Sequence, residues 1–248
     1  MTEIQYMSDL HLELYPGFRI ENITASFLVL AGDIGDPDTF EYFEFMNDVS
    51  TKYEKVFIVL GNHEYYGKTI MQTLTKVNEI LSNIPKQNVI LLDRTGYDII
   101  PGELRIIGAT LWSHIPPINA YDIQCFIQDF RRIKDMSITE YNNMHLQDVS
   151  WIEVERILAE INGINLIVVT HHAPIRNINP KHANSSLNSA FNTDLEYIIQ
   201  TPILAWIYGH THFSNTRNIN GVQVVSNQRG YVDEGVVFDL GKTLQVKV

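Results

Sequence analysis

Residues 56–64 read VFIVLGNHE, an apolar run that stops at a glycine and continues as three polar residues. Consecutive apolar and β-branched residues over this length are typical of a strand that is buried on both faces. Polar side chains directly after such a strand serve little structural purpose unless a polar site lies beyond its end. The segment therefore predicts a buried strand at residues 56–60 that delivers Asn62 and His63 to a functional site.

Four further apolar strands are predicted to end in the same way, with Asp or His residues just beyond them. They are residues 4–7 followed by Asp9 and His11, 27–31 followed by Asp33, 166–170 followed by His171, and 203–208 followed by His210 and His212. In α/β sheets, ligand-binding groups gather where the carboxyl ends of the strands meet. We therefore expect the polar clusters to converge at one edge.

Predicted helices and strands alternate along the rest of the chain, as in a layered α/β protein. Helical periodicity is present at residues 38–53, 68–83, 120–128, 139–161 and 187–200. Further strands are expected at residues 89–92, 97–100, 104–111, 236–240 and 244–248, with turns at Pro101-Gly102 and Asn220-Gly221. No linker, repeat or low-complexity stretch interrupts the sequence, so we expect a single domain over residues 1–248.

The composition narrows the classes of partner. The formal net charge is −11, with 29 acidic against 18 basic residues. A general nucleic-acid binder normally presents a basic patch, so stable nucleic-acid binding is not expected.

Cys125 is the only cysteine, which excludes an intrachain disulfide and a thiolate metal cluster. No apolar run reaches the roughly 18–20 residues of a membrane span. With no secretory signal recognised either, we expect a soluble, cytoplasmic protein of unspecified oligomeric state.

Taken singly, each cluster has an ordinary structural explanation. Asp9 with His11 is equally compatible with a capping aspartate beside a surface histidine, and Asp33 after a glycine is more often a turn residue or a helix cap. The His210-x-His212 pair is more informative, because imidazole is a common ligand of Zn, Fe, Mn and Ni. The function therefore has to be inferred from the set of clusters.

The clusters in their order along the chain resemble the calcineurin-like metallophosphoesterase family. The motifs are Asp-x-His, Gly-Asp, Gly-Asn-His-Glu, His and Gly-His-x-His, and they span residues 9–212. The resemblance implies an α/β fold, a four-layer αββα sandwich in which two mixed β-sheets are flanked by helices. It also implies two divalent transition-metal ions, with Mn²⁺ favoured and Fe or Zn²⁺ as alternatives.

The resemblance also implies a role for each polar residue. One metal is expected to bind Asp9, His11 and His212, and the other Asn62, His171 and His210, with Asp33 bridging the two. A shared carboxylate partly neutralises two close dications, and a pair of ions can generate hydroxide near neutral pH. The family mechanism is in-line attack of this metal-bridging hydroxide on phosphorus.

His63 corresponds to the residue that protonates the leaving oxygen in the family, which makes it the expected general acid. Asp36 matches the carboxylate that orients this histidine in the protein-phosphatase branch. The alternative for Asp36, equally compatible with the sequence, is a simple turn residue beside Pro37.

The chain departs from the larger branches of the family. Pro37 stands where protein phosphatases carry a phosphate-binding arginine, and purple acid phosphatases lack the first-motif histidine that His11 supplies. Segments such as QDFRRI at 128–133 and NQRGY at 227–231 resemble small bacterial and phage phosphohydrolases. Arg131 and Arg229 in them are candidate clamps for phosphate or base, or else structural salt bridges. His172 is a further candidate to support a ligand or contact substrate.

These features favour an enzyme that hydrolyses small phosphodiesters or phosphomonoesters, with nucleotide-like substrates as the first guess. The expected partner is therefore a small phosphate ester. The alternative is a non-catalytic scaffold or regulatory protein that retains the fold and the metal site. Such a protein would be expected to lose metal ligands or His63, and all of these residues are present.

Overall fold

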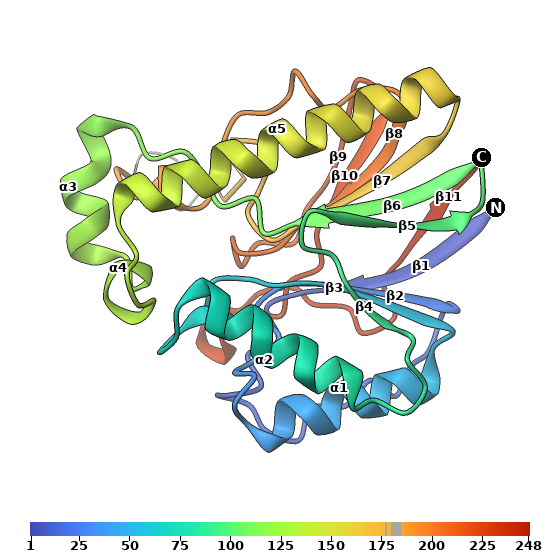
Figure 1. Ribbon diagram of the computed structural model, residues 1–248, viewed down its shortest axis with the longest axis horizontal. Helices are drawn as coiled ribbons and strands as arrows, with labels where there is room; N and C mark the ends of the chain where they lie inside the picture. Colours follow the sequence, from blue (N-terminus) through green and yellow to red (C-terminus); the bar gives the residue numbers. More distant parts are fainter. Residues whose placement is uncertain (177, 180–184) are drawn as a thin grey trace.

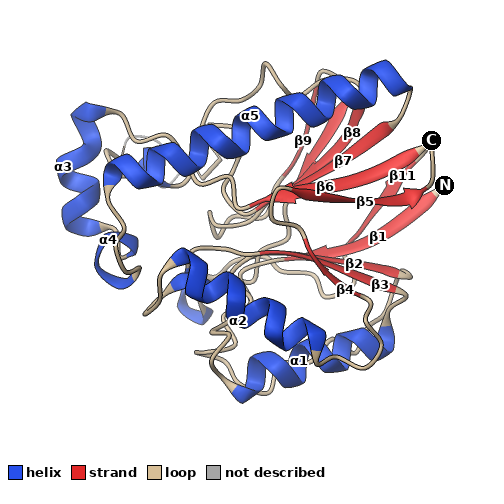
Figure 2. Cartoon of the chain, in the orientation of Figure 1, coloured by secondary structure: helices blue, strands red, loops and turns tan. Residues whose placement is uncertain are grey.

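The computed structural model describes residues 1–176, 178–179 and 185–248. Two β-sheets lie face to face, with helices on their outer sides (Figure 1, Figure 2). The strand order is β11-β1-β2-β3-β4 in the first sheet and β5-β6-β7-β8-β10-β9 in the second. The strands are β1 (Thr2–Met7), β2 (Phe27–Ala31), β3 (Lys55–Val59), β4 (Val89–Leu91), β5 (Thr95–Ile100), β6 (Leu104–Ala109), β7 (Asn165–Thr170), β8 (Ile203–Ile207), β9 (Thr216–Ile219), β10 (Val222–Val225) and β11 (Thr243–Val246).

Both sheets are mixed, with parallel strands in the interior and antiparallel strands at edges. In the first sheet β1 to β4 run parallel and β11 pairs antiparallel with β1. In the second, β6, β7, β8 and β10 run parallel, and β5 and β9 are antiparallel edge strands. This arrangement brings the carboxyl ends of the parallel strands of both sheets to one end of the sandwich.

Helices complete the two outer layers. Helices α1 (Phe40–Lys52) and α2 (Ile70–Ser82) cover the first sheet, and α5 (Ile138–Asn162) runs along the second (Figure 1). Two short helices, α3 (Pro117–Phe126) and α4 (Asp129–Arg132), lie near the carboxyl ends of the strands. The predicted sandwich of two mixed sheets between helices is therefore confirmed.

Capping side chains mark where the long helices begin. Thr69 accepts a hydrogen bond from the backbone amide of Gln72, whose side chain accepts one from the Thr69 amide in return, which closes a capping box before α2. The hydroxyl of Ser137 caps α5 by accepting from the backbone amide of Glu140.

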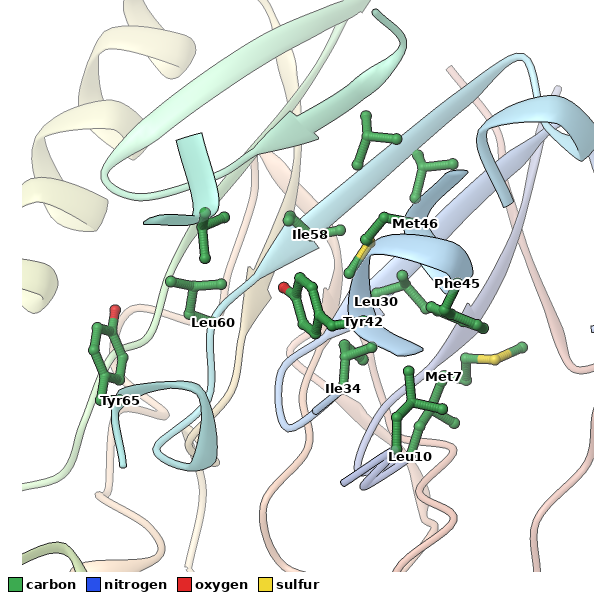
Figure 3. Packing of buried hydrophobic residues seen from close by; sticks show 14 of the residues in the cluster. Met7, Leu10, Leu30, Ile34, Tyr42, Phe45, Met46, Ile58, Leu60 and Tyr65 are labelled. Atoms are coloured by element: carbon green, nitrogen blue, oxygen red, sulfur yellow. The ribbon is translucent and has the colours of Figure 1, made fainter. Parts of the chain in front are cut away.

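The strands of the first sheet are buried on both faces, which explains their continuous apolar sequences. Val29 and Phe57 belong to the core between the sheets. Leu30 and Ile58, one position further along β2 and β3, belong to the core on the other face, where they pack with Tyr42 of α1 (Figure 3). All five side chains are at most 1% exposed, so alternate residues stabilise the two layers by hydrophobic burial.

The helix expected at residues 187–200 does not form, and this prediction was wrong. A single 3-10 turn, η3 (Asn188–Ala190), is followed by backbone that bridges to the residues after β7. The amide of Thr193 donates to the Ala173 carbonyl at 3.1 Å. Asn, Ser, Thr and Asp are frequent in this stretch, and their short polar side chains compete with helical hydrogen bonds.

The strand expected at residues 236–240 is also absent. The side chain of Asn227 takes the place of a neighbouring strand, since its Oδ1 accepts from the Asp239 amide at 3.1 Å and its Nδ2 donates to the Asp239 carbonyl at 2.8 Å. The hairpin expected around Pro101-Gly102 does form, as β5 paired with β6. No helix in the described part of the chain combines the length and apolar character that crossing a bilayer requires.

Gly108 of β6 provides a test of the contact between the sheets. A Cβ atom there would lie 2.9 Å from the Leu92 Cβ, the Val169 carbonyl oxygen and the Val59 Cγ2. We expect Gly108→Ala to lower the free energy of unfolding by about 1–3 kcal/mol through overpacking, measured by urea unfolding. Thr95→Ala, at the exposed residue paired with Gly108 in β5, is the control and should cost less than about 0.5 kcal/mol. Equal midpoints for both variants would contradict the prediction.

Candidate metal centre

Seven polar side chains follow the carboxyl ends of β1, β2, β3, β7 and β8, and we call them the strand-end cluster. They are Asp9, His11, Asp33, Asn62, His171, His210 and His212. Six of them form two groups whose ligand-type atoms lie within 4.8 Å of one another, Asp9 with His11 and His212, and Asp33 with His171 and His210. The seventh, Asn62, places its Oδ1 atom 3.1 Å from His171 Nε2. The structure therefore brings together the residues that the sequence suggested as metal ligands.

The first group contains two imidazoles that face each other. The Nε2 atoms of His11 and His212 are 3.1 Å apart, and His212 Nε2 is 3.4 Å from Asp9 Oδ1. The Nδ1 atoms point away, His11 toward Glu13 at 3.3 Å and His212 toward Glu234. In the tautomer whose Nδ1–H donates to the carboxylate, each ring would present the lone pair of its Nε2 atom to a metal ion. Two lone pairs beside a carboxylate are a donor set that fits a cation.

The second group is built on His171. Its Nε2 atom is 3.4 Å from Asp33 Oδ1 and 3.1 Å from Asn62 Oδ1, while its Nδ1 contacts the Ala31 carbonyl at 2.9 Å. His210 contacts the Ala190 carbonyl through Nε2 at 3.3 Å, so its Nδ1 is the ring nitrogen that could bind a metal ion. This group therefore offers imidazole nitrogen, carboxylate oxygen and amide oxygen, which suits divalent transition metals.

The amide of Asn62 is held in one orientation by residues that the sequence did not single out. Its Nδ2 donates to Asp129 Oδ1 at 2.8 Å and to the Tyr66 hydroxyl at 3.0 Å. The Tyr66 hydroxyl in turn donates to Asp129 Oδ1 at 2.8 Å. With both amide hydrogens engaged, the oxygen faces His171. Asp129 lies in the QDFRRI segment, and its position beside Arg131 was the available signal.

The buried carboxylates of the cluster favour positive charge beside them. Burial would raise the pKa of the Asp9 and Asp33 carboxyls, but hydrogen bonds and nearby histidines lower both below the usual range. Burial opposes protonation of the imidazoles as well. Nevertheless, Asp33 raises the pKa of His171 to about 9, and Asp9 and Glu234 raise that of His212 to about 10. Divalent cations can supply this charge in place of protons.

The backbone at the strand ends is strained. Five cluster residues adopt positive φ angles, namely Asp9 (54°), His11 (50°), Asp33 (51°), His210 (70°) and His212 (44°). Non-glycine residues adopt this region rarely, and such strain concentrates at functional sites. Gly61 permits the close approach of the loops, because a Cβ atom there would lie 2.1 Å from Asp33 Oδ1.

The carboxylate beside His63 is Glu13 and not Asp36. The contacts therefore favour the other reading of Asp36, a residue of the turn beside Pro37 whose Oδ1 accepts from the Asp38 amide. His63 Nδ1 is 3.0 Å from Glu13 Oε1, whereas Asp36 is partly exposed and forms a salt bridge with Lys68 at 3.0 Å. Burial would lower the pKa of His63, but Asp33 and Glu13 together raise it above the ordinary value. Glu13 lies two residues after His11, and this spacing was the only signal in the sequence.

The three suggested substrate contacts do not line the cavity beside the cluster. Arg131 is exposed and donates to the Cys125 carbonyl. Arg229 donates to the Leu10 carbonyl at 2.8 Å, and its guanidinium stacks over Tyr15. Both arginines therefore have structural contacts, although with backbone carbonyls and an aromatic ring instead of the salt bridges considered from sequence.

His172 is fully buried, and it contacts the Tyr141 hydroxyl through Nε2 at 3.0 Å. Its ring centroid lies 4.0 Å from that of His210. This position behind a cluster residue agrees with the supporting role considered from sequence and not with direct substrate contact.

Comparison with known proteins gives a family. The calcineurin-like phosphoesterase family model matches residues 7–214. An uncharacterized protein of Acanthamoeba polyphaga mimivirus is 32% identical over 262 residues, covering 94% of this chain and 93% of that protein.

Two solved structures share the fold at low sequence identity. A phosphopantetheinyl hydrolase from Mycobacterium tuberculosis has a TM-score of 0.66 and 15% identity, covering 94% of this chain and 91% of its own. A dimetal phosphatase from Danio rerio has a TM-score of 0.57 and 13% identity, covering 92% and 87%. With the family match over most of its length, the chain belongs to the calcineurin-like phosphoesterases and is a metal-dependent phosphoester hydrolase.

Proposed function

We propose that the strand-end cluster binds two divalent metal ions and that the enzyme hydrolyses small phosphate esters there. Asp9, His11 and His212 would hold one ion, and Asn62, His171 and His210 the other, with Asp33 between them. The convergence of these seven side chains from five strand ends is the observation that carries the proposal. Nitrogen and oxygen donors without a thiolate favour Mn²⁺, with Fe or Zn²⁺ as alternatives.

Each part of the cluster would have a separate task in hydrolysis. When bound, two such ions would lower the pKa of a coordinated water and offset negative charge on the phosphoryl oxygens. The carboxylates Glu13 and Glu234 orient His11 and His212, and the Ala31 and Ala190 carbonyls orient His171 and His210. Fixed ligand rings of this kind preserve the geometry of a metal site.

We propose His63 as the general acid that protonates the leaving oxygen. Its ring lines the cavity beside the cluster. The Nδ1 atom is engaged by Glu13, so Nε2 is the atom available for proton transfer, 3.9 Å from Asp33 Oδ2 and 3.4 Å from the Tyr231 hydroxyl. The raised pKa of His63 favours the protonated form that a general acid requires.

The proposed substrates are small phosphodiesters or phosphomonoesters, with nucleotide-like esters as the broad first choice from sequence. Membership of the phosphoesterase family supports the reaction class. The non-catalytic alternative gains no support from the geometry, because His63 and the full set of proposed ligands are in mutual reach.

Metal content tests the proposed ligands. We expect wild-type protein purified without chelator to contain up to two transition-metal ions per chain by elemental analysis. Asp33→Asn should lose more than half of the bound metal, because it removes a carboxylate charge from both proposed sites. Asp36→Asn is the matched control and should keep the wild-type content, since Asp36 pairs with Lys68. Retention of metal by Asp33→Asn would argue against the bridging role.

The role of His63 predicts a dependence on the leaving group. We expect His63→Asn to lower kcat by about 10²–10⁴-fold for an ester with an alkoxide leaving group. A p-nitrophenyl ester should be affected much less, because p-nitrophenolate needs little protonation. Metal content is measured in parallel. Equal losses on both esters, or loss of metal, would mean that His63 is a ligand or a structural residue.

Glu13 and Asp36 can be distinguished by the same assay. Glu13→Gln keeps the size of the side chain but removes the charge that orients both His63 and the proposed ligand His11, so we expect an activity loss of about 10–100-fold on the alkyl ester. Asp36→Asn should leave activity near the wild-type level. A loss in Asp36→Asn without one in Glu13→Gln would restore the assignment made from sequence.

A further inference from the structure

The cavity beside the strand-end cluster has walls of two kinds. Its volume is about 370 Å³, and it is lined on the polar side by cluster residues such as Asp33 and His210 together with His63. The remaining wall includes a group of apolar side chains. They are Phe126, Ile127, Ile178, Leu187 and Phe191.

The apolar wall is built by segments that lie beyond the carboxyl ends of the strands. Phe126 ends α3 and Ile127 follows it, near that end of the sandwich (Figure 1). Leu187 and Phe191 flank η3. The Phe191 ring stacks on His210 with a centroid distance of 4.8 Å and an interplanar angle of 26°. The apolar wall therefore adjoins the cluster directly.

One residue of the wall, Phe126, is an exposed apolar side chain. Phe126 is 66% exposed, and apolar surface gains about 25 cal/mol per Å² when it leaves water. Single exposed apolar residues are ordinary, and Phe40 on α1 is equally exposed at 67%. Phe126 differs because it shares a cavity with other apolar side chains and with polar groups, the combination typical of a small-molecule site.

Resting on the proposed function, we propose that this wall binds the alcohol part of the substrate. The substrate class would then be phosphate esters of uncharged alcohols that carry an aryl or other apolar group. A phosphoryl group at the cluster leaves the rest of a small ester inside the same cavity. Glu234 and Asp129 also line the cavity, and their carboxylates disfavour an alcohol that carries negative charge.

Non-hydrolysable phosphonates test the wall independently of catalysis. Benzylphosphonate, hydroxymethylphosphonate and phosphonoacetate differ only in the group attached to the methylene carbon. By calorimetry with Mn²⁺-loaded protein, we expect benzylphosphonate to bind about 10–100-fold more tightly than hydroxymethylphosphonate. Phosphonoacetate should bind most weakly. Equal affinities for the three compounds would overturn the proposal.

A pair of variants places the effect on the wall. Phe126→Ala should weaken benzylphosphonate binding about 3–10-fold and leave hydroxymethylphosphonate binding unchanged. Phe40→Ala removes an equally exposed phenyl group from α1 and should change neither affinity. A uniform loss for both compounds in Phe126→Ala would mean that the residue supports the fold and does not contact the ligand.

Hydrolysis of benzyl phosphate and 2-hydroxyethyl phosphate separates this proposal from the proposed function. We expect kcat/KM to favour the benzyl ester. Selective binding of benzylphosphonate without hydrolysis of either ester would support the apolar site and overturn the proposed function. Hydrolysis of both esters with equal kcat/KM would overturn the apolar site and leave the proposed function standing.

Discussion

Buried negative charge is the constraint on which this structure depends. The carboxylates of Asp9 and Asp33 are at most 1% exposed, and an unpaired buried carboxylate is strongly destabilising. Backbone amides offset part of the cost, from His210 to Asp9 at 3.0 Å and from His63 to Asp33 at 2.9 Å. These donors are neutral, so the pKa of His171 still rises to about 9. A metal-dependent enzyme meets the same demand with cations.

The same constraint extends behind the cluster to Glu64. This fully buried carboxylate accepts hydrogen bonds from the backbone amides of Asp33, Ile34 and Gly61 at 3.1, 2.7 and 2.8 Å. Burial, together with the charge of Asp33, raises the pKa of Glu64 to about 7. Glu64 therefore ties the end of β2 to the end of β3, and the loops that carry Asp33 and Asn62 are held by polar contacts as well as by apolar packing.

The residues at the strand ends were predictable because two signals coincide there. An apolar run sets the strand, and parallel pairing then brings its end to the common edge, so sequence order alone indicated the convergence. The partners of these residues were not predictable in the same way. Asp36 follows Asp33 by three positions and Glu13 follows His11 by two. In the folded chain, however, Asp36 pairs with Lys68, whereas Glu13 contacts His63. The single domain expected over residues 1–248 stays a prediction.

Long side chains were the least predictable. An arginine spans several ångströms, and its direction depends on partners that are distant in the sequence. Arg229 donates to the Leu10 carbonyl and stacks over the ring of Tyr15, which lie 219 and 214 positions earlier in the sequence. A motif can indicate that a guanidinium is near a site, but the tertiary contacts decide whether it reaches the cavity.

The orientations of Asn62 and His63, two consecutive residues after β3, depend on partners that are distant in the sequence. Asn62 and His63 lie in one turn, and the His63 amide donates to Asp33 Oδ1. Asp129 holds the amide of Asn62 at 2.8 Å, so that its oxygen faces His171. Glu13 holds His63 Nδ1 at 3.0 Å and leaves only Nε2 toward the cluster. Two carboxylates from separate elements thus turn neighbouring side chains apart, which allows one to serve as the proposed ligand and the other as the proposed acid.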